Sequence, residues 1–348
     1  MFKGPFCENP MHRATLNALF FLMVPFLMML HACASKHHVM PPLATVEGEK
    51  RHFSQGRIID LTTGKAIDFP ALIDRMEPVD VIFVGEVHDN PEHHLIEVQL
   101  LQALMTRYAP PVAVAMEFFD TTRQSVLDRF MEGDLDETAF LKEVDWKNAW
   151  RFPYHLYRPL LWISKDKGSA LVGINAPNRI VRKVARTGLE SLTPEERNQV
   201  ARDMDLDNKA HRDYLSSIFK QHASGKKPTR GLGNFDYFYQ AQCVWDETMA
   251  QTIADYMANH MKAHGGKMVV FTGSGHIVNR FGIPERVLRR VDINAATILL
   301  YPLTERTTIN KKLADYVWLT SDAKTGRTLK RPMKMPPLKT SIKGSTAK

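Results

Sequence analysis

The chain has 348 residues, 44% hydrophobic and 24% charged, an ordinary composition for a soluble globular protein that can bury one large core or two modest ones. Its net charge of +8 is concentrated in residues 323–348, which hold eight lysines and arginines and no acid. Because the preceding chain is close to neutral, the composition argues against a nucleic-acid-binding domain.

The first 32 residues have the pattern of a secretory signal peptide. A weakly positive start is followed by an apolar run from Ala18 to Leu30, which is too short for a secure membrane span. The run ends Leu-His-Ala-Cys, a pattern similar to the lipobox of bacterial lipoproteins, and this predicts that Cys33 is lipidated and becomes the first residue. A secreted protein cut nearby is the alternative. Translation could start at Met1 or Met11.

Beyond the predicted signal peptide, we expect a polar tether at 33–55, an α/β domain at 56–322 and a disordered basic tail at 323–348. The domain contains one cysteine, Cys243, which lies in a helical pattern and is expected to be a buried apolar residue.

A repeated motif organises the domain. Residues 81–88 read VIFVGEVH and residues 269–276 read VVFTGSGH, so each apolar strand ends in Gly-x-x-His. The repetition predicts two related halves, with His88 and His276 at the same edge of one sheet. Glycines at 85 and 273 would permit the tight turns that aim the polar side chains.

The remaining pattern alternates strands with helices. We expect a hairpin around 62–65, a helix from Pro91, and further strands at 112–116, 170–174, 296–301 and 315–320. Mostly helical segments fill 120–165 and 190–260. The sequence therefore predicts an α/β fold with a mainly parallel sheet, whose helical insertions cover the carboxyl edge of the strands.

Four polar residues fall at or just after the predicted strand ends: Glu86, His88, Glu117 and His276. Ligands bind beyond the carboxyl ends of strands in open α/β sheets, so these side chains are expected to converge. If the protein is an enzyme, all four residues would be catalytic, and His88, Glu117 and His276 would bind a divalent metal. Capping of the following helix is the alternative for Glu86 and His88, and the matching Gly-x-x-His at the second strand counts against it.

An aromatic cluster between residues 146 and 162 offers a second kind of site, with core packing as the alternative. Tyr157 beside Arg158 couples a phenol to a guanidinium, which together suit a large planar anionic ligand containing ferric iron. Tyr154 is a second candidate phenol. His93 and His94 follow Pro91 in a first helical turn, where histidines are usually solvated.

Several segments in collinear order resemble the ChaN-like haem-binding lipoproteins, which share a superfamily with the erythromycin esterases and the Tiki proteins. These segments span roughly residues 55–320 and read GEVHDNPEHH, AMEFF, LYRP, GINAPNRIV, QAQCVWDETMA and GSGHIVNRFGIPERV. The resemblance implies an α/β fold and a lipid-anchored protein on the periplasmic face of the outer membrane.

The resemblance also implies a role in haem or iron uptake, haem as cofactor, and haem held between the two subunits of a homodimer. A haem-uptake receptor would be a further partner. Glu86, His88, Glu117 and His276 match the Glu/His set that serves catalysis in the enzymatic branches. The motifs assign no haem-ligating tyrosine. On chemistry, Tyr157 and Tyr154 are the expected haem ligands, Arg158 is the propionate partner, and His93 or His94 are the competing ligands.

Two functions therefore remain open. The favoured one is a haem carrier without turnover, and the alternative is a metal-dependent hydrolase that uses the four Glu and His residues. Whether the chain is an enzyme stays undecided at this stage.

Overall fold

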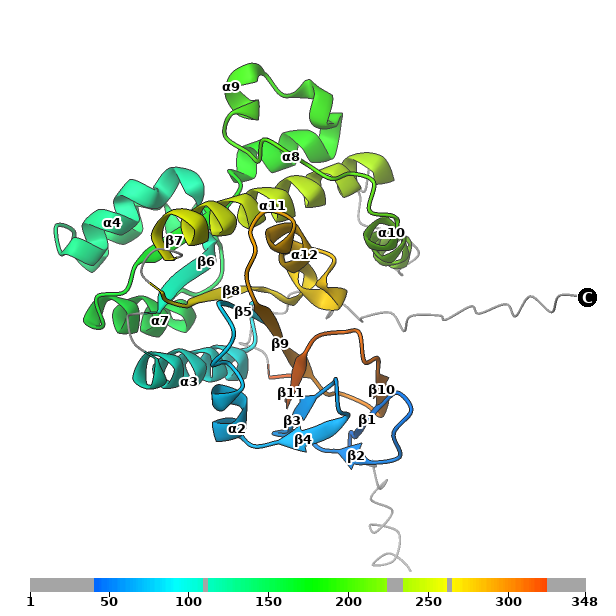
Figure 1. Cartoon of the computed structure of the whole chain (residues 1–348). Coiled ribbons are helices and arrows are strands. Elements are labelled where there is room, and N and C mark those ends of the chain that lie inside the picture. The colour runs from blue at the N-terminus through cyan, green and yellow to red at the C-terminus, as the bar shows by residue number, and fades with distance from the viewer. Residues whose placement is uncertain (1–40, 109–111, 224–233, 262–264, 324–348) are drawn as a thin grey trace, which may run out of the picture. The chain divides into compact units, whose positions relative to one another are not determined.

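The computed structural model describes residues 41–108, 112–223, 234–261 and 265–323 (Figure 1). The fold described below belongs to the compact unit of residues 42–348. The predicted signal peptide, Cys33 and all but the first residue of the predicted basic tail lie outside the described residues.

The main sheet has eight strands in the order β4-β3-β11-β9-β5-β8-β6-β7, and all pairings from β11 to β7 are parallel. Its strands are β3 (Ile58–Asp60), β4 (Lys65–Ile67), β5 (Val81–Glu86), β6 (Ala113–Asp120), β7 (Leu171–Asn175), β8 (Met268–Gly273), β9 (Ala295–Pro302) and β11 (Tyr316–Thr320). The antiparallel pair of β3 and β4 is the predicted hairpin, and the mainly parallel α/β fold is confirmed.

Helices pack on both faces of this sheet (Figure 1). Side chains alternate between the two faces of a strand, so Ile82 and Val84 of β5 contribute to one core and Val81 and Phe83 to the other. The helices on the first face are α2 (Phe69–Asp74), α3 (Pro91–Arg107), α4 (Gln124–Glu132), α5 (Glu137–Glu143), α6 (Trp146–Ala149) and α7 (Tyr154–Asp166). Those on the second are α10 (Lys209–Ala223), α11 (Phe235–Tyr256) and α12 (Ile283–Leu288).

Two shorter helices, α8 (Asn178–Thr187) and α9 (Pro194–Arg197), follow β7, and α8 packs against α11 in a third apolar cluster. Cys243 of α11 is fully buried and free, as expected, and burial raises the pKa of its thiol to about 12. No helix among the described residues is long and apolar enough to cross a membrane.

The predicted tether differs from the structure. Residues Ala44–Val46 form β1 and His52–Phe53 form β2, which join β10 (Thr307–Ile309) in a three-stranded sheet. These strands form because Ala44, Val46 and Phe53 are buried in the second core, so this polar stretch carries enough apolar surface to fold. The ordered region therefore begins before residue 56.

The two motif strands β5 and β8 are neighbours in the sheet. Their pairing is shifted by one residue relative to the alignment of the two motifs, which would place Gly85 opposite Gly273. Gly85 lies opposite Thr272, and Glu86 lies opposite Gly273. Since the pairing is parallel, the segments that carry His88 and His276 leave the sheet at the same edge.

Candidate functional site

Glu86, His88, Glu117 and His276 come together at the carboxyl end of β5, β8 and β6, as predicted. Glu117, however, lies inside β6 and not beyond it. The pairing of β6 with β7 shifts register between Met116 and Asp120, and such an irregularity re-aims the side chains within it. The Glu117 carboxylate accepts hydrogen bonds from the Thr272 hydroxyl (2.7 Å) and from the Gly273 backbone N–H (2.6 Å).

The two motif glycines serve close packing and not a turn, because neither has a positive φ. A Cβ on Gly85 would lie 2.6 Å from Cδ1 of Ile277, and a Cβ on Gly273 would lie 2.9 Å from Cε1 of His88. The absent side chain at 273 therefore makes room for the imidazole of His88 next to Glu117.

Each of the two site histidines is held by a carboxylate through Nδ1. His88 Nδ1 lies 2.7 Å from Glu86 Oε1, and His276 Nδ1 lies 2.6 Å from Asp246 Oδ1. This leaves Nε2 of His276 3.4 Å from Glu117 Oε1 and Nε2 of His88 beside Gly273. Such carboxylate–histidine pairs orient imidazoles in both metal sites and acid–base sites.

The pKa values of the two histidines shift in opposite directions. Burial lowers the pKa of His88. Burial also disfavours the charged form of His276, but Glu117 and Asp246 overcome it and raise the pKa of His276 to about 10. Burial likewise opposes ionisation of Glu117, yet His276 and the Gly273 N–H hold the pKa of that carboxyl well below its usual range. A neutral imidazole thus faces an imidazolium–carboxylate pair.

Sequence reasoning missed Asp246 and its neighbour Gln242, whose side chain contacts both Asp246 (3.2 Å) and His276 (3.1 Å). The two residues are four apart on α11 and therefore share one helix face. Both lie in the QAQCVWDETMA segment. A Gln and an Asp four residues apart, on the same face of a predicted helix that is otherwise apolar, could have indicated them.

His93 and His94 are buried and not solvated. Nδ1 of His93 accepts a hydrogen bond from the Val87 N–H (2.8 Å), and its Nε2 lies 2.8 Å from the Thr320 hydroxyl. Burial together with the charge of His94 lowers the pKa of His93 to about 3, so this imidazole is a neutral structural group. Burial opposes the charge of His94 as well, but Glu86 and Glu97 raise its pKa to about 9.

Tyr157 and Arg158 point in different directions from α7 and do not share a surface. Tyr157 is fully buried, its hydroxyl donates to the carbonyl of His88 (3.1 Å), and its ring lies 4.5 Å from that of His94. A porphyrin could reach Tyr157, His93 or His94 only after the surrounding chain had moved.

Tyr154 and Arg158 do share a surface, with Trp162 one further turn along α7, and we call these three residues the α7 face. All three donate hydrogen bonds to Glu137 Oε1, over 2.8, 2.6 and 3.1 Å respectively. Trp162 is 38% exposed, and the Arg158 guanidinium lies 5.2 Å from its ring centre. Burial and the bond to Glu137 raise the pKa of Tyr154. An aromatic surface, a phenol and a cation together fit the edge and one face of a haem.

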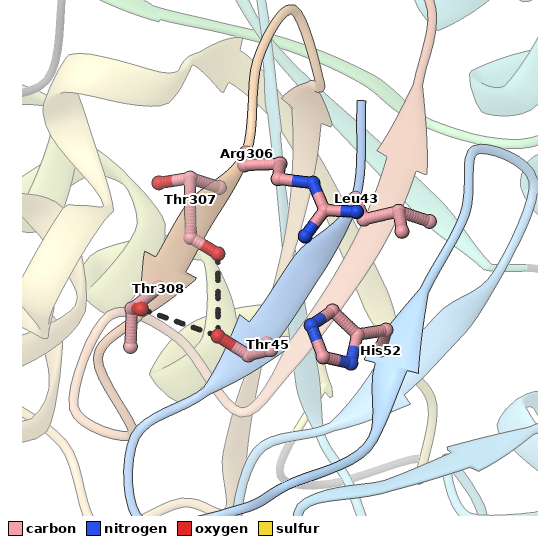
Figure 2. A pocket seen from close by; sticks show the side chains of 6 residues that line it. All are labelled: Leu43, Thr45, His52, Arg306, Thr307 and Thr308. Atoms are coloured by element: carbon pink, nitrogen blue, oxygen red, sulfur yellow. Dashed lines mark hydrogen bonds between the residues drawn. The ribbon is translucent and has the colours of Figure 1, made fainter. Parts of the chain in front are cut away.

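A separate shallow pocket lies in the three-stranded sheet. Figure 2 shows its lining, in which Arg306 and His52 face one another and the Thr45 hydroxyl contacts Thr308 (3.2 Å) and the Thr307 carbonyl (3.4 Å). Its volume of about 180 Å³ is below the range usual for a drug-sized ligand, so it does not suit a porphyrin.

A family model described as haem-binding uptake, Tiki superfamily, ChaN, matches residues 72–287. A curated relative, the chloroplastic protein RETICULATA-RELATED 5 of Arabidopsis thaliana, is 24% identical over 257 residues, which cover 68% of this chain. The chain spans only 34% of the length of that relative.

Among solved structures, ChaN of Campylobacter jejuni, whose structure is titled for cofacial haem binding, has a TM-score of 0.59 at 21% identity. The match covers 75% of this chain and 95% of that one, and it shows the same fold. The erythromycin esterase EreC in its open conformation matches at a TM-score of 0.43 and 12% identity, over 72% of this chain and 77% of the esterase.

Proposed function

Since this chain belongs to the family of haem-binding uptake proteins known as ChaN, within the Tiki superfamily, we propose that it carries haem during iron uptake. The family match favours this function over the metal-dependent hydrolase. We further propose that Cys33 carries a lipid that holds the protein on the periplasmic face of the outer membrane. A haem-uptake receptor would then receive or deliver the haem there.

The observation that supports a haem site on this chain is the exposed α7 face. Tyr154 would bind ferric iron as a phenolate, Trp162 would lie against the porphyrin, and Arg158 would pair with a propionate. Binding has a cost, because Tyr154 must give up the proton that it shares with Glu137 and its raised pKa opposes this step.

The exposed His155, next to Tyr154 in the first turn of α7, is a competing ligand that the sequence reasoning did not consider. One helix face covers only one side of a planar porphyrin. A second copy of the chain that presents its own α7 face would cover the other side, and this is the basis for a haem-bound homodimer.

Haemin titration of four proteins tests the assignment by absorption and electron paramagnetic resonance. We expect the wild type and Tyr157→Phe to give a ferric tyrosinate spectrum, and Tyr154→Phe to lose it. A wild-type spectrum typical of histidine ligation, unchanged in Tyr154→Phe and lost in His155→Ala, would instead identify His155 as the ligand. Loss only in Tyr157→Phe would show that the buried tyrosine becomes accessible.

A further inference from the structure

A buried cluster below the partly exposed site is unexplained by haem binding. It consists of Glu86 at the end of β5 and of His94 and Glu97 on the first turns of α3. The three residues are 1%, 3% and 0% exposed. One nitrogen or oxygen from each lies within 4.8 Å of the others.

Two carboxylate oxygens in this cluster lack a hydrogen-bond donor. Oε1 of Glu86 is bonded to His88 and Oε2 of Glu97 to His94, but Glu86 Oε2 and Glu97 Oε1 are both buried and unsatisfied. Unsatisfied buried carboxylate oxygens are costly, and in native proteins they point to a proton, a water or an ion between them.

The geometry around His94 Nε2 suits a metal ion. Glu86 and Glu97 favour the protonated ring when no cation is bound. A cation that displaces the Nε2 proton would meet the lone pair of that nitrogen, while the other proton stays on Nδ1, which lies 2.9 Å from Glu97 Oε2. Nε2 lies 3.0 Å from Glu86 Oε2 and 3.2 Å from the carbonyl oxygen of His88. With metal–ligand bonds of about 2.0–2.2 Å, neighbouring ligand atoms lie about 3.0–3.5 Å apart, which matches both separations.

Charge leads to the same conclusion. Two ionised carboxylates and a neutral imidazole carry −2, which a divalent ion balances in full. A proton on His94 Nε2 would balance half of this charge and could donate to Glu86 Oε2 (3.0 Å), but Glu97 Oε1 would still lack a donor.

We propose that Glu86, His94 and Glu97 bind one divalent transition-metal ion, with the His88 carbonyl as an additional ligand. One imidazole with oxygen ligands suits zinc or manganese. The ion would fix the Glu86 carboxylate, whose other oxygen holds His88. This site differs from the one predicted from the sequence, in which His88, Glu117 and His276 were the metal ligands. It is also independent of haem binding.

Metal analysis of the haem-free full chain, purified from medium containing zinc and manganese, tests this proposal. We expect about one zinc or manganese ion per chain in the wild type and at least tenfold less in Glu97→Gln. Glu117→Gln is the matched control, because it changes another buried glutamate of the same edge, and it should retain the metal.

If Glu97→Gln does not fold, the wild type alone still decides the question. Incubation with a chelator should lower its unfolding midpoint, and zinc or manganese, but not magnesium, should restore it. A folded wild type with less than one ion per ten chains would overturn the proposal. So would a metal that Glu97→Gln keeps and Glu117→Gln loses.

Discussion

At the scale of single residues, Gly85 shows how closely the site is packed. A methyl group there would overlap the Ile277 side chain and approach the Cα of Ser274 at 3.1 Å. We expect Gly85→Ala to lower the free energy of unfolding by about 1–3 kcal/mol, as overpacking does elsewhere. Gly275→Ala is the control, since its methyl group would meet nothing within 4 Å, and its effect should stay within about 0.5 kcal/mol. Equal effects in a urea titration would refute the close-packing account of Gly85.

His93 makes a second prediction at this scale, which concerns pH. Its pKa falls from 6.5 to about 3 on folding, so below pH 6.5 the unfolded chain binds a proton that the folded chain does not. Stability from this residue is present above pH 6.5 and is lost as the pH falls toward 3. Between pH 6.5 and 4.5 we expect a loss of up to about 3 kcal/mol.

Chemical unfolding of wild type and His93→Gln at pH 6.5, 5.5 and 4.5 isolates this contribution from other titrating groups. The stability advantage of the wild type should shrink as the pH falls. A constant advantage would show that His93 titrates normally, and an advantage that grows on acidification would show that folding raises its pKa; either result would contradict this prediction.

At the scale of elements, the contact between α11 and α12 depends on a buried ion pair. Glu247 of α11 is fully buried, and its carboxylate lies 3.0 Å from Arg286 Nε, 3.1 Å from Arg289 Nη2 and 2.6 Å from Arg290 Nη2. Asp246 also stabilises the charge of Arg286, but Glu247→Gln removes the carboxylate that lies 3.0 Å from its buried Nε, so we expect a loss of about 3–5 kcal/mol.

The matched control is Glu143→Gln, which removes the exposed ion pair with Arg129 (2.7 Å) and should cost less than about 1 kcal/mol. Thermal or urea unfolding of both variants measures the difference. If the two variants lose the same stability, the α11–α12 contact does not rest on Glu247.

The elements themselves were largely predictable, because apolar runs such as 81–84 and 268–272 are long enough to specify strands without tertiary context. Convergence of Glu86, His88, Glu117 and His276 followed from strand direction alone. The inward orientation of Tyr157 and the burial of His93 did not follow, since both depend on which face of a helix meets the sheet. The strands at 44–53 were missed because only their packing against the second core makes so polar a stretch fold.

At the scale of the whole molecule, lipidation of Cys33 is a prediction that lies outside the described residues. In a bacterial host with a lipoprotein pathway, Cys33→Ala should leave the outer-membrane fraction and become soluble in the periplasm. Cys7→Ala is the control, because that residue precedes the apolar run, and it should remain in the membrane. A Cys33→Ala protein that still pellets after a carbonate wash would place the anchor elsewhere.

Haem held between two copies of the chain is the central claim, and sedimentation velocity with haemin tests it most directly. The domain is run with and without haemin, with detection at 280 nm and at the haem absorption band. We predict that haem absorbance sediments only with a dimer, and that without haemin the chain is a monomer. Haem absorbance that sediments apart from the protein would contradict haem binding, and haem confined to the monomer would contradict the shared site.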